Sequence, residues 1–356
     1  MLAFGLVMLF STSSYQAGLE FDGDSTFYLR HQLLASLAGL AFMYLASRVP
    51  YRVLKRMTVP AYAASMAVIF LVLTPLAYSA NGATRWFKIL GVSVQPAEVA
   101  KLGMIIFLAG VIDRLGKNAA DTRVFLIAMF LPVPVCVLVY GITDNLSSAL
   151  IIMGICLLML FIAVPDYKRF VLIGAVIVSL GALMVLIAEK TKDNPLNYRF
   201  LRILIWRDPE AYASGRGFQT LQALYAIGSG GIFGKGLGQS IQKKFIPEAQ
   251  NDMIFSIICE ELGLFGAIAV ILMFLIIIWR LMIIANNAVD RFGALLVVGV
   301  MGHLAIQVIL NIAVVTNTMP NTGITLPFIS YGGSAVVLQL IEIGICLSVA
   351  RSIRVE

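Results

Sequence analysis

Residues 245–263 are FIPEAQNDMIFSIICEELG, a polar loop that continues into an apolar helix. Asp252 lies where the polar loop gives way to that helix, and Glu260 and Glu261 follow inside the apolar run. Carboxylates at membrane depth are costly, and those that occur usually serve a function. We therefore expect this segment to lie at a membrane surface, with the rest of the chain holding it there.

The composition is that of a membrane protein. Hydrophobic residues make up 60% of the chain and charged residues 13%, and the mean hydropathy is +0.93. A soluble core cannot use that much apolar side chain. The net charge of +7 does not indicate nucleic-acid binding, because the cations fall mainly between apolar runs. The four cysteines lie in apolar runs without metal-binding spacing, and the two histidines are isolated, so no metal motif is present.

Ten apolar segments are candidates to cross a bilayer, which takes roughly 20 residues of helix. They are residues 2–14, 32–46, 59–76, 96–112, 124–140, 146–164, 170–188, 252–279, 292–315 and 334–349. No basic residue precedes the first segment, so we expect a spanning helix with a trimmed native beginning rather than a signal peptide. The predicted fold is an all-α integral membrane protein, a ten-helix bundle forming one polytopic domain over residues 1–356.

The distribution of basic residues predicts the orientation of these segments. With a cytoplasmic N-terminus, the short outside loops hold only Arg30, Arg85 and Lys88. The inside segments then hold Arg48, Arg52, Lys55, Arg56, Arg114, Lys117, Arg123, Lys168, Arg169, Arg280, Arg291, Arg351 and Arg354. The positive-inside rule therefore predicts that both termini are cytoplasmic and that the long polar stretch 189–251 is extracellular.

The extracellular stretch contains apolar pieces and a glycine-rich run. Leu201–Trp206 and Phe218–Ile227 have the pattern of amphipathic helices lying at an interface. The run GSGGIFGKGLG, residues 228–238, matches neither a Walker motif nor GxGxxG. We favour a tight multi-turn loop. The alternative is a nest of N–H groups that meets a lipid diphosphate beside Lys235.

The three carboxylates of the first segment are not expected to act together. Asp252 is either a helix N-cap or a catalytic group. Glu260 is eight residues further on, about 12 Å along a helix and about 80° around it, whereas glycosidase carboxylates lie about 5 to 9 Å apart. A catalytic Asp252 would thus work as a single base or with partners from other helices. Glu260 and Glu261 are expected to be buried, paired and holding helices together.

Two further polar constellations lie at predicted outer helix ends. Glu98 and Lys101 are three residues apart on one helix face. They either brace the helix as an ion pair or face a wet cavity, which we favour. The sequence NTGITLPFISYGGS, residues 321–334, is a broken entry to the last helix, and such backbone at membrane depth lines a cavity unless it is an ordinary outer loop. A weaker polar turn spans residues 143–148.

These stretches resemble the SEDS family of bacterial cell-wall proteins (FtsW, RodA and SpoVE) over nearly the whole chain. The motifs that carry the resemblance are NGATRWFKILG, QPAEVAKL, DPEAYASGRGFQTLQALYAIGSGGIFGKGLGQS, PEAQNDMIFSIICEELG and TGITLPFISYGGS. The form Pro247-Glu-Ala is more similar to the FtsW and SpoVE branch. Departures include Ala97, where the family commonly has Ser, and residues 144–148, which differ enough that Asp144 is not assigned to the site.

The resemblance implies a peptidoglycan glycosyltransferase that polymerises lipid II with inversion and releases undecaprenyl diphosphate. The family's essential aspartate corresponds to Asp252, as general base on the acceptor 4-hydroxyl. Glu98 and Lys101 match the family's charged pair beside the central cavity. Beyond the resemblance, we expect three cations to stabilise the leaving diphosphate: Arg207, Lys243 and Lys244. We also expect three further residues to contact the substrate in the cavity: Arg85, Ser330 and Tyr331.

The resemblance also implies a place and a partner. Family members reside in the bacterial plasma membrane and work with a class B penicillin-binding protein, the transpeptidase. No cofactor is assigned, and a divalent cation, Mg²⁺ or Mn²⁺, is the candidate left open. Two other functions were weighed. A lipid II flippase would be expected to have an inverted repeat with paired broken helices, which the sequence lacks. A non-enzymatic scaffold would leave the outer polar cluster without a purpose.

Overall fold

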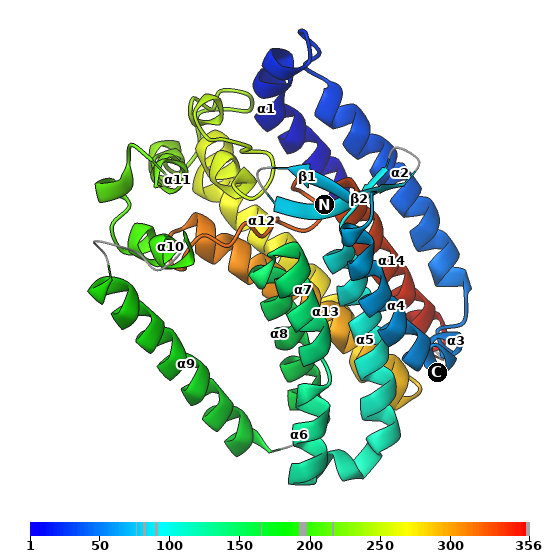
Figure 1. The fold of residues 1–356 in the computed structure, drawn as a ribbon. Helices are drawn as coiled ribbons and strands as arrows, with labels where there is room; N and C mark the ends of the chain where they lie inside the picture. The colour runs from blue at the N-terminus through cyan, green and yellow to red at the C-terminus, as the bar shows by residue number, and fades with distance from the viewer. Residues whose placement is uncertain are drawn as a thin grey trace. The chain divides into compact units, whose positions relative to one another are not determined.

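The computed structural model describes residues 1–356 except 76, 81–82, 90–91, 165, 192–197, 216 and 354–356. Arg354 of the charge pattern, the last residue of the predicted segment 59–76 and five motif positions, 81, 82, 90, 91 and 216, lie outside the described residues. The chain forms two compact units. Unit 1 comprises Met1–Arg30, Asp166–Met273 and Val308–Tyr331, and unit 2 comprises His31–Pro165, Phe274–Gln307 and Gly332–Glu356. Helices make up most of both units (Figure 1).

Seven helical stretches in the described part of the chain are long and apolar enough to cross a membrane. They are α1 (Leu2–Glu20), α6 with α7 (Thr122–Thr143), α8 (Leu146–Ala163), α9 (Tyr167–Lys190), α12 (Ile254–Asn286), α13 (Arg291–Val315) and α14 (Gly333–Arg351). The other predicted segments fall on α2 (Phe27–Arg48), α4 (Thr58–Phe70) and α5 (Pro96–Leu115). The chain is therefore a multi-pass membrane protein, and a total of ten spans stays a prediction.

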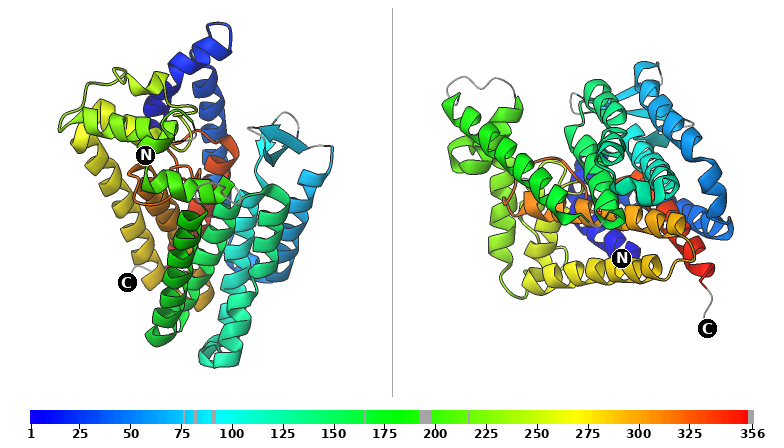
Figure 2. Two further views of the ribbon diagram at one scale, coloured as in Figure 1. Left: turned by 60° about the vertical axis from the view of Figure 1, so that its left-hand side comes forward. Right: turned by 90° about the horizontal axis from the view of Figure 1, so that it is seen from below.

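Unit 2 is built around helices that pack closely. α4 lies against α5, α5 against α8 and α8 against α7, and these four helices run side by side in Figure 1 and in both views of Figure 2. The close approach depends on small residues, because a Cβ atom at Gly103 of α5 would lie 2.1 Å from Ser65 Oγ of α4. Beyond its start, α5 buries a continuous apolar face from Met104 to Ile112.

A small sheet in unit 2 departs from the all-α prediction. β1 (Ala77–Ala80), β2 (Ala83–Ile89) and β3 (Val92–Val94) form an antiparallel sheet in that order, with Phe87 opposite both Ala77 and Val94. Aromatic and β-branched residues favour strands, and side chains alternate between the faces of a strand. Phe87 is buried while the adjacent Lys88 is exposed. This alternation is too short to stand out beside long apolar helices.

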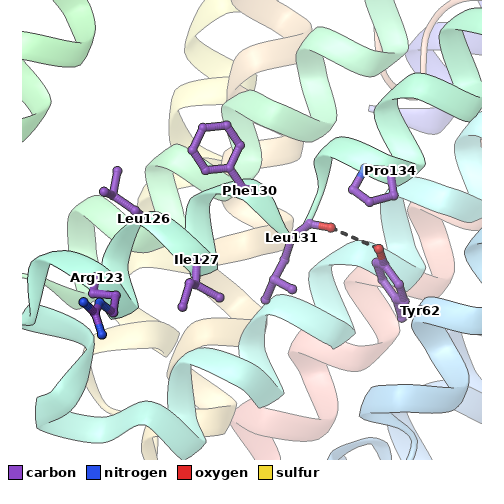
Figure 3. Close-up of a pocket in the computed structure, with 7 residues that line it drawn as sticks. All are labelled: Tyr62, Arg123, Leu126, Ile127, Phe130, Leu131 and Pro134. Atoms are coloured by element: carbon purple, nitrogen blue, oxygen red, sulfur yellow. Dashed lines mark hydrogen bonds between the residues drawn. The ribbon is translucent and has the colours of Figure 1, made fainter.

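The predicted helix 124–140 is interrupted. α6 (Thr122–Phe130) ends before Pro132, and α7 (Val133–Thr143) begins after it, because proline cannot donate the helical hydrogen bond. At the break, the Tyr62 hydroxyl donates to the Leu131 carbonyl over 3.1 Å. A cavity of about 430 Å³ lies beside this break (Figure 3). Its lining is apolar apart from Tyr62 and Arg123, so it is not the candidate active site.

α12 is also interrupted, at Gly263, whose φ of 66° and ψ of −162° are not helical. The glycine-rich run supplies the missing hydrogen bonds. Lys235 and Gly236 donate their N–H groups to the carbonyls of Glu260 and Glu261 over 2.9 Å each, and Leu264 donates to the Gly231 carbonyl over 2.9 Å. The prediction of a tight loop is confirmed, and these N–H groups are occupied by the helix.

The stretch between α9 and α12 contains the two predicted helices. They are α10 (Tyr198–Arg207) and α11 (Phe218–Gly230), joined by shorter turns that include Glu210–Tyr212 and Gln242–Lys244. α10 packs against α9, and α11 packs against the turn Gln242–Lys244. The prediction of helices over 201–206 and 218–227 is thus confirmed, and these helices bring polar side chains to the residues before α12.

Candidate active site

Asp252 is fixed by its backbone. It lies two residues before α12, so the helix begins later than the predicted start at residue 252. The buried Asn311 side chain of α13 donates from Nδ2 to the Asp252 carbonyl over 2.8 Å and to the Ile324 carbonyl over 2.7 Å. One amide therefore holds together three segments of unit 1: the entry to α12, α13 and the loop 316–332.

The Asp252 carboxylate, in contrast, makes weak contacts. Gln219 of α11 donates from Nε2 to Oδ1 over 3.4 Å, and the Gln219 side-chain oxygen accepts from Asn321 over 3.4 Å. Gly323 has a φ of +70°, and a Cβ atom there would lie 3.8 Å from Asp252 Oδ2. The half-buried carboxylate thus lies beside polar side chains and the backbone of Gly323.

The surroundings tune this carboxylate toward neutral pH. Burial raises the pKa of Asp252 to about 6, with a further upward contribution from the negative charge of Glu248. The positive charge of Arg202 and the Gln219 hydrogen bond act in the opposite direction. Arg202 of α10 also donates to the Asn321 carbonyl over 3.1 Å. A carboxylate with such a pKa, beside a cation, is suited to general-base catalysis.

The residues Ser330 and Tyr331 lie in the same unit. Ser330 is buried, and its Oγ accepts from the Leu326 N–H over 2.8 Å, which stabilises the turn before α14. The Tyr331 N–H donates to the Gln250 carbonyl over 2.9 Å, and its ring lies edge-on to Tyr28 at 5.0 Å. Burial raises the pKa of Tyr331. The segment before the last helix is therefore hydrogen-bonded to Gln250, two positions before Asp252 in the sequence.

The three predicted cations have other contacts in unit 1. Arg207 pairs with Glu189. Lys243 is buried and donates to the carbonyls of Ser11 and Gly238 over 3.0 and 2.8 Å, and to Glu261 over 3.4 Å. Lys244 lies over the Tyr15 ring at 5.5 Å. Arg202, Gln219 and Asn321 were not predicted as site residues. The feature of the sequence that could have indicated one of them is the charge of Arg202 inside the apolar run 201–206.

The two glutamates inside α12 are buried and paired, as predicted. Glu260 accepts from Lys235 Nζ over 2.6 Å and from the N–H groups of Ile241 and Gln242 over 3.2 Å each. Glu261 accepts from Ser11 of α1 over 2.6 and 2.7 Å, and from Lys243 over 3.4 Å. Both side chains are fully buried. They fasten α12 to the glycine-rich loop and to α1.

Unit 2 contains the other predicted site residues. Lys101 Nζ lies 2.7 Å from Glu98, both side chains are buried, and Lys101 also donates to Gln307 of α13 over 3.4 Å. The predicted ion pair is confirmed, and its exposure to a cavity stays a prediction. Arg85 of β2 donates to the carbonyls of Thr143 and Asp144 over 3.3 and 2.9 Å, which ties the sheet to the end of α7.

The side chains near Asp252 offer few ligands for a divalent cation. Among the described residues, no three of His, Cys, Asp and Glu form a metal-binding group. Mg²⁺ needs only one or two carboxylates when substrate phosphates complete its shell. Asp252 and the nearby Glu248 are the carboxylates that could serve in that way, and we assign no step to a metal.

Comparison with known proteins covers the whole chain. A family model of FtsW, RodA and SpoVE, described as cell cycle protein, matches residues 1–355. Stage V sporulation protein E of Bacillus subtilis is 37% identical over 99% of this chain and 94% of its own. The probable peptidoglycan glycosyltransferase FtsW of Trichlorobacter lovleyi is 35% identical over 99% and 91%.

Solved structures of similar fold are also known. A chain of a peptidoglycan synthase complex, whose structure concerns polymerisation and crosslinking, superposes with a TM-score of 0.77 at 26% identity, covering 98% of this chain and 96% of that one. The rod shape determining protein RodA of Thermus thermophilus gives a TM-score of 0.68 at 26% identity, with 100% and 97% coverage.

Proposed function

Because this chain belongs to the family of FtsW, RodA and SpoVE, we infer that it is a peptidoglycan glycosyltransferase. It polymerises lipid II into glycan strands and releases undecaprenyl diphosphate. The relatives named for this activity match along the whole chain at about the same identity as the sporulation protein. The polar cluster around Asp252 supports our proposal for the site of this activity, and it is the single observation that carries the assignment of the catalytic base.

We propose that Asp252 is the general base. Its carboxylate takes the proton from the 4-hydroxyl of the acceptor sugar, and the oxygen attacks the anomeric carbon of the donor. The bond from that carbon to the diphosphate breaks, with inversion, and the proton then passes from Asp252 to water. A pKa of about 6 supports this role, because such a group is ionised at neutral pH and still accepts a proton readily.

We propose Arg202 as the principal cation for the departing diphosphate. Its charge acts on Asp252, and a guanidinium can bind phosphate oxygens in a bidentate way. Arg207 and Lys244 are secondary candidates. Lys243 is buried with three acceptors, so we assign it to the support of Glu261. A fixed positive group is most effective where charge develops in the transition state.

The remaining predicted site residues are proposed as substrate contacts of the cavity. The Glu98–Lys101 pair is buried at the start of a helix, where an ion pair is costly unless it serves a purpose. Arg85, Ser330 and Tyr331 would act through the segments they hold, since their described contacts are mainly with backbone carbonyl and N–H groups.

We also propose the setting of the reaction. The chain is one polytopic domain of ten spans in the bacterial plasma membrane, with both termini cytoplasmic and residues 189–251 outside. A class B penicillin-binding protein is its partner. The charge pattern supports the orientation, and the similarity to a chain of a peptidoglycan synthase complex supports the partner.

The test is polymerisation of lipid II by the purified full-length protein, with and without its cognate penicillin-binding protein made catalytically dead. Wild type is compared with Asp252→Asn, Asp252→Ala and the control Asp24→Asn, an outer carboxylate that contacts Thr26 and Arg30. We expect glycan chains from wild type and Asp24→Asn and a loss of about 10² to 10⁴ in rate for both Asp252 variants. Equal rates in all four proteins would remove Asp252 as the base.

A further inference from the structure

A histidine and a glutamate face each other inside unit 2. His303 Nδ1 of α13 lies 2.8 Å from Glu342 Oε2 of α14, and both side chains are about 1% exposed. His303 is about 18 Å of helix beyond Arg291 at 1.5 Å per residue. That is near the middle of a hydrocarbon core about 30 Å thick, where such groups are rare and usually functional.

The pair has unused hydrogen-bonding capacity. His303 Nε2 and Glu342 Oε1 are buried and have no hydrogen-bond partner among the described residues. Leaving a buried polar atom unsatisfied costs about 1 to 3 kcal/mol. Buried water commonly fills such positions and makes two to four hydrogen bonds. The site therefore has the features of an internal position for water and for a proton.

A column of polar side chains leads from this pair toward one end of the helices. Gln307 is one turn after His303 on α13, and Gln339 is one turn before Glu342 on α14. Both are buried, and because consecutive spanning helices run in opposite directions, both lie on the same side of the pair. Gln307 accepts from Lys101, which pairs with Glu98. Glu98 Oε2 is a further buried oxygen without a partner among the described residues.

The charge balance favours an added proton. With a neutral imidazole and an ionised carboxylate, the pair carries one negative charge in an apolar interior. The charged groups that face it are Lys101 and Glu98, which neutralise each other, and the thiol of Cys346 lies one turn along α14. α8 contains no charged residue, and α2 contains none between Gln32 and Ser47. One bound proton makes the pair neutral, which removes the cost of a net buried charge.

We propose that His303 and Glu342 form a buried proton-binding site, supplied through the column of Glu98, Lys101, Gln307 and Gln339. The proton comes from water at the Glu98 end and passes along ordered water to His303 Nε2, while Nδ1–H donates to Glu342. The imidazole becomes imidazolium, and no electron is transferred. The bound proton stabilises the contact between α13 and α14, so the protonation state of the His303–Glu342 pair controls this contact.

The test uses nitrogen-15 NMR of histidine side chains in the full-length protein in lipid nanodiscs. The chain contains two histidines, and His31→Gln assigns their signals. Spectra are recorded between about pH 5 and pH 8, where an ordinary imidazole changes its charge. We expect two ring protons on His303 in the wild type, one in Glu342→Gln and two in Glu342→Asp.

A singly protonated His303 ring in the wild type across this pH range would overturn the proposal, as would a ring unaffected by Glu342→Gln. The route is tested separately by the exchange of the His303 ring N–H with D₂O. We expect slower exchange in Glu98→Gln, with the same ring protonation as wild type. Unchanged exchange would refute the column as the proton path. Because both readouts are independent of lipid II, they stand or fall separately from the transferase assignment.

Discussion

The carboxylates on either side of the α12 entry lie within nine residues of each other and have opposite surroundings. Glu260 and Glu261 are fully buried and saturated with donors, including one lysine each. Asp252 is half-buried, its described side-chain hydrogen bond is 3.4 Å long, and burial raises its pKa to about 6. Depth in the membrane alone does not identify a catalytic carboxylate. The weak hydrogen bonding and raised pKa of Asp252 are what favour it as the proposed base.

The largest effect on stability is expected at Glu261. Glu261→Ala leaves Lys243 buried without its carboxylate, and breaking a buried pair costs about 3 to 5 kcal/mol. The matched variant Asp252→Ala should lose less than 1 kcal/mol, since it removes only weak contacts. The measurement is thermal unfolding of both proteins in the same detergent. Adding Lys243→Met to Glu261→Ala should recover part of the loss, and equal losses for Glu261→Ala and Asp252→Ala would contradict the comparison.

The second effect concerns the cation beside the base. Arg202→Ala should lower kcat/KM about 10²-fold by removing a positive charge near the departing diphosphate. It should also move the pH profile of the reaction upward, because Arg202 lowers the pKa of Asp252. Arg30→Ala is the control, since Arg30 is an exposed cation of the same unit that pairs with Asp24. An unshifted profile in Arg202→Ala would place this cation away from the base.

The third prediction concerns the break in α12 at Gly263, which follows Glu260 and Glu261. Gly263→Ala forces a side chain into a positive φ and places its Cβ 2.3 Å from the Gly234 nitrogen. Such backbone strain costs about 1 to 3 kcal/mol. The control is Gly181→Ala in α9, where a Cβ has nothing within 4 Å. We expect a lower unfolding temperature for Gly263→Ala alone, and no difference between the two would show that the loop does not hold the break.

The sequence predicted the helices better than their interruptions. The apolar runs fall on helices because spanning length and apolarity are local properties, although the run 59–76 continues past the end of α4 at Phe70. The breaks at Pro132 and Gly263 depend on partners, since the loop around Gly234 must be present to accept and donate the bonds that α12 lacks. The strand pairs of residues 77–94 were missed because a short alternation is a weak signal.

The site residues also divide into those with a local signal in the sequence and those that depend on contacts between distant segments. Asp252 and the Glu98–Lys101 pair could be proposed from the sequence, because charges stand out in apolar sequence, and their roles stay predictions. Arg202, Gln219 and Asn321 were not, since they come from three separate segments and meet only in the folded unit. Lys243 was proposed for the diphosphate on proximity in sequence, and its three acceptors give it a different role.

A smaller effect is expected for Asp252→Asn on the free energy of unfolding at neutral pH. The folded-state pKa of Asp252 is raised from 3.8 to about 6, so its contribution to stability is full below pH 4 and is lost as the pH rises through 6. Asp252→Asn removes this ionisation and should be more stable than wild type above pH 6. A shift of about 2 pKa units at about 1.4 kcal/mol each gives about 3 kcal/mol, which solvent screening of this partly exposed group reduces to on the order of 1 to 2 kcal/mol. Unfolding at pH 4 and pH 7.5 measures the difference, which should vanish at pH 4.

The most direct test of the central claim is the pH dependence of kcat/KM for lipid II polymerisation by the wild-type protein with its catalytically dead partner. A single essential base with a pKa of about 6 predicts a rate that rises tenfold per pH unit below 6 and reaches a plateau above it. Gln219→Leu, which removes the hydrogen bond that favours the ionised form, should move the midpoint upward. A rate that is flat between pH 5 and pH 8 in both proteins would contradict the assignment of Asp252 as the base.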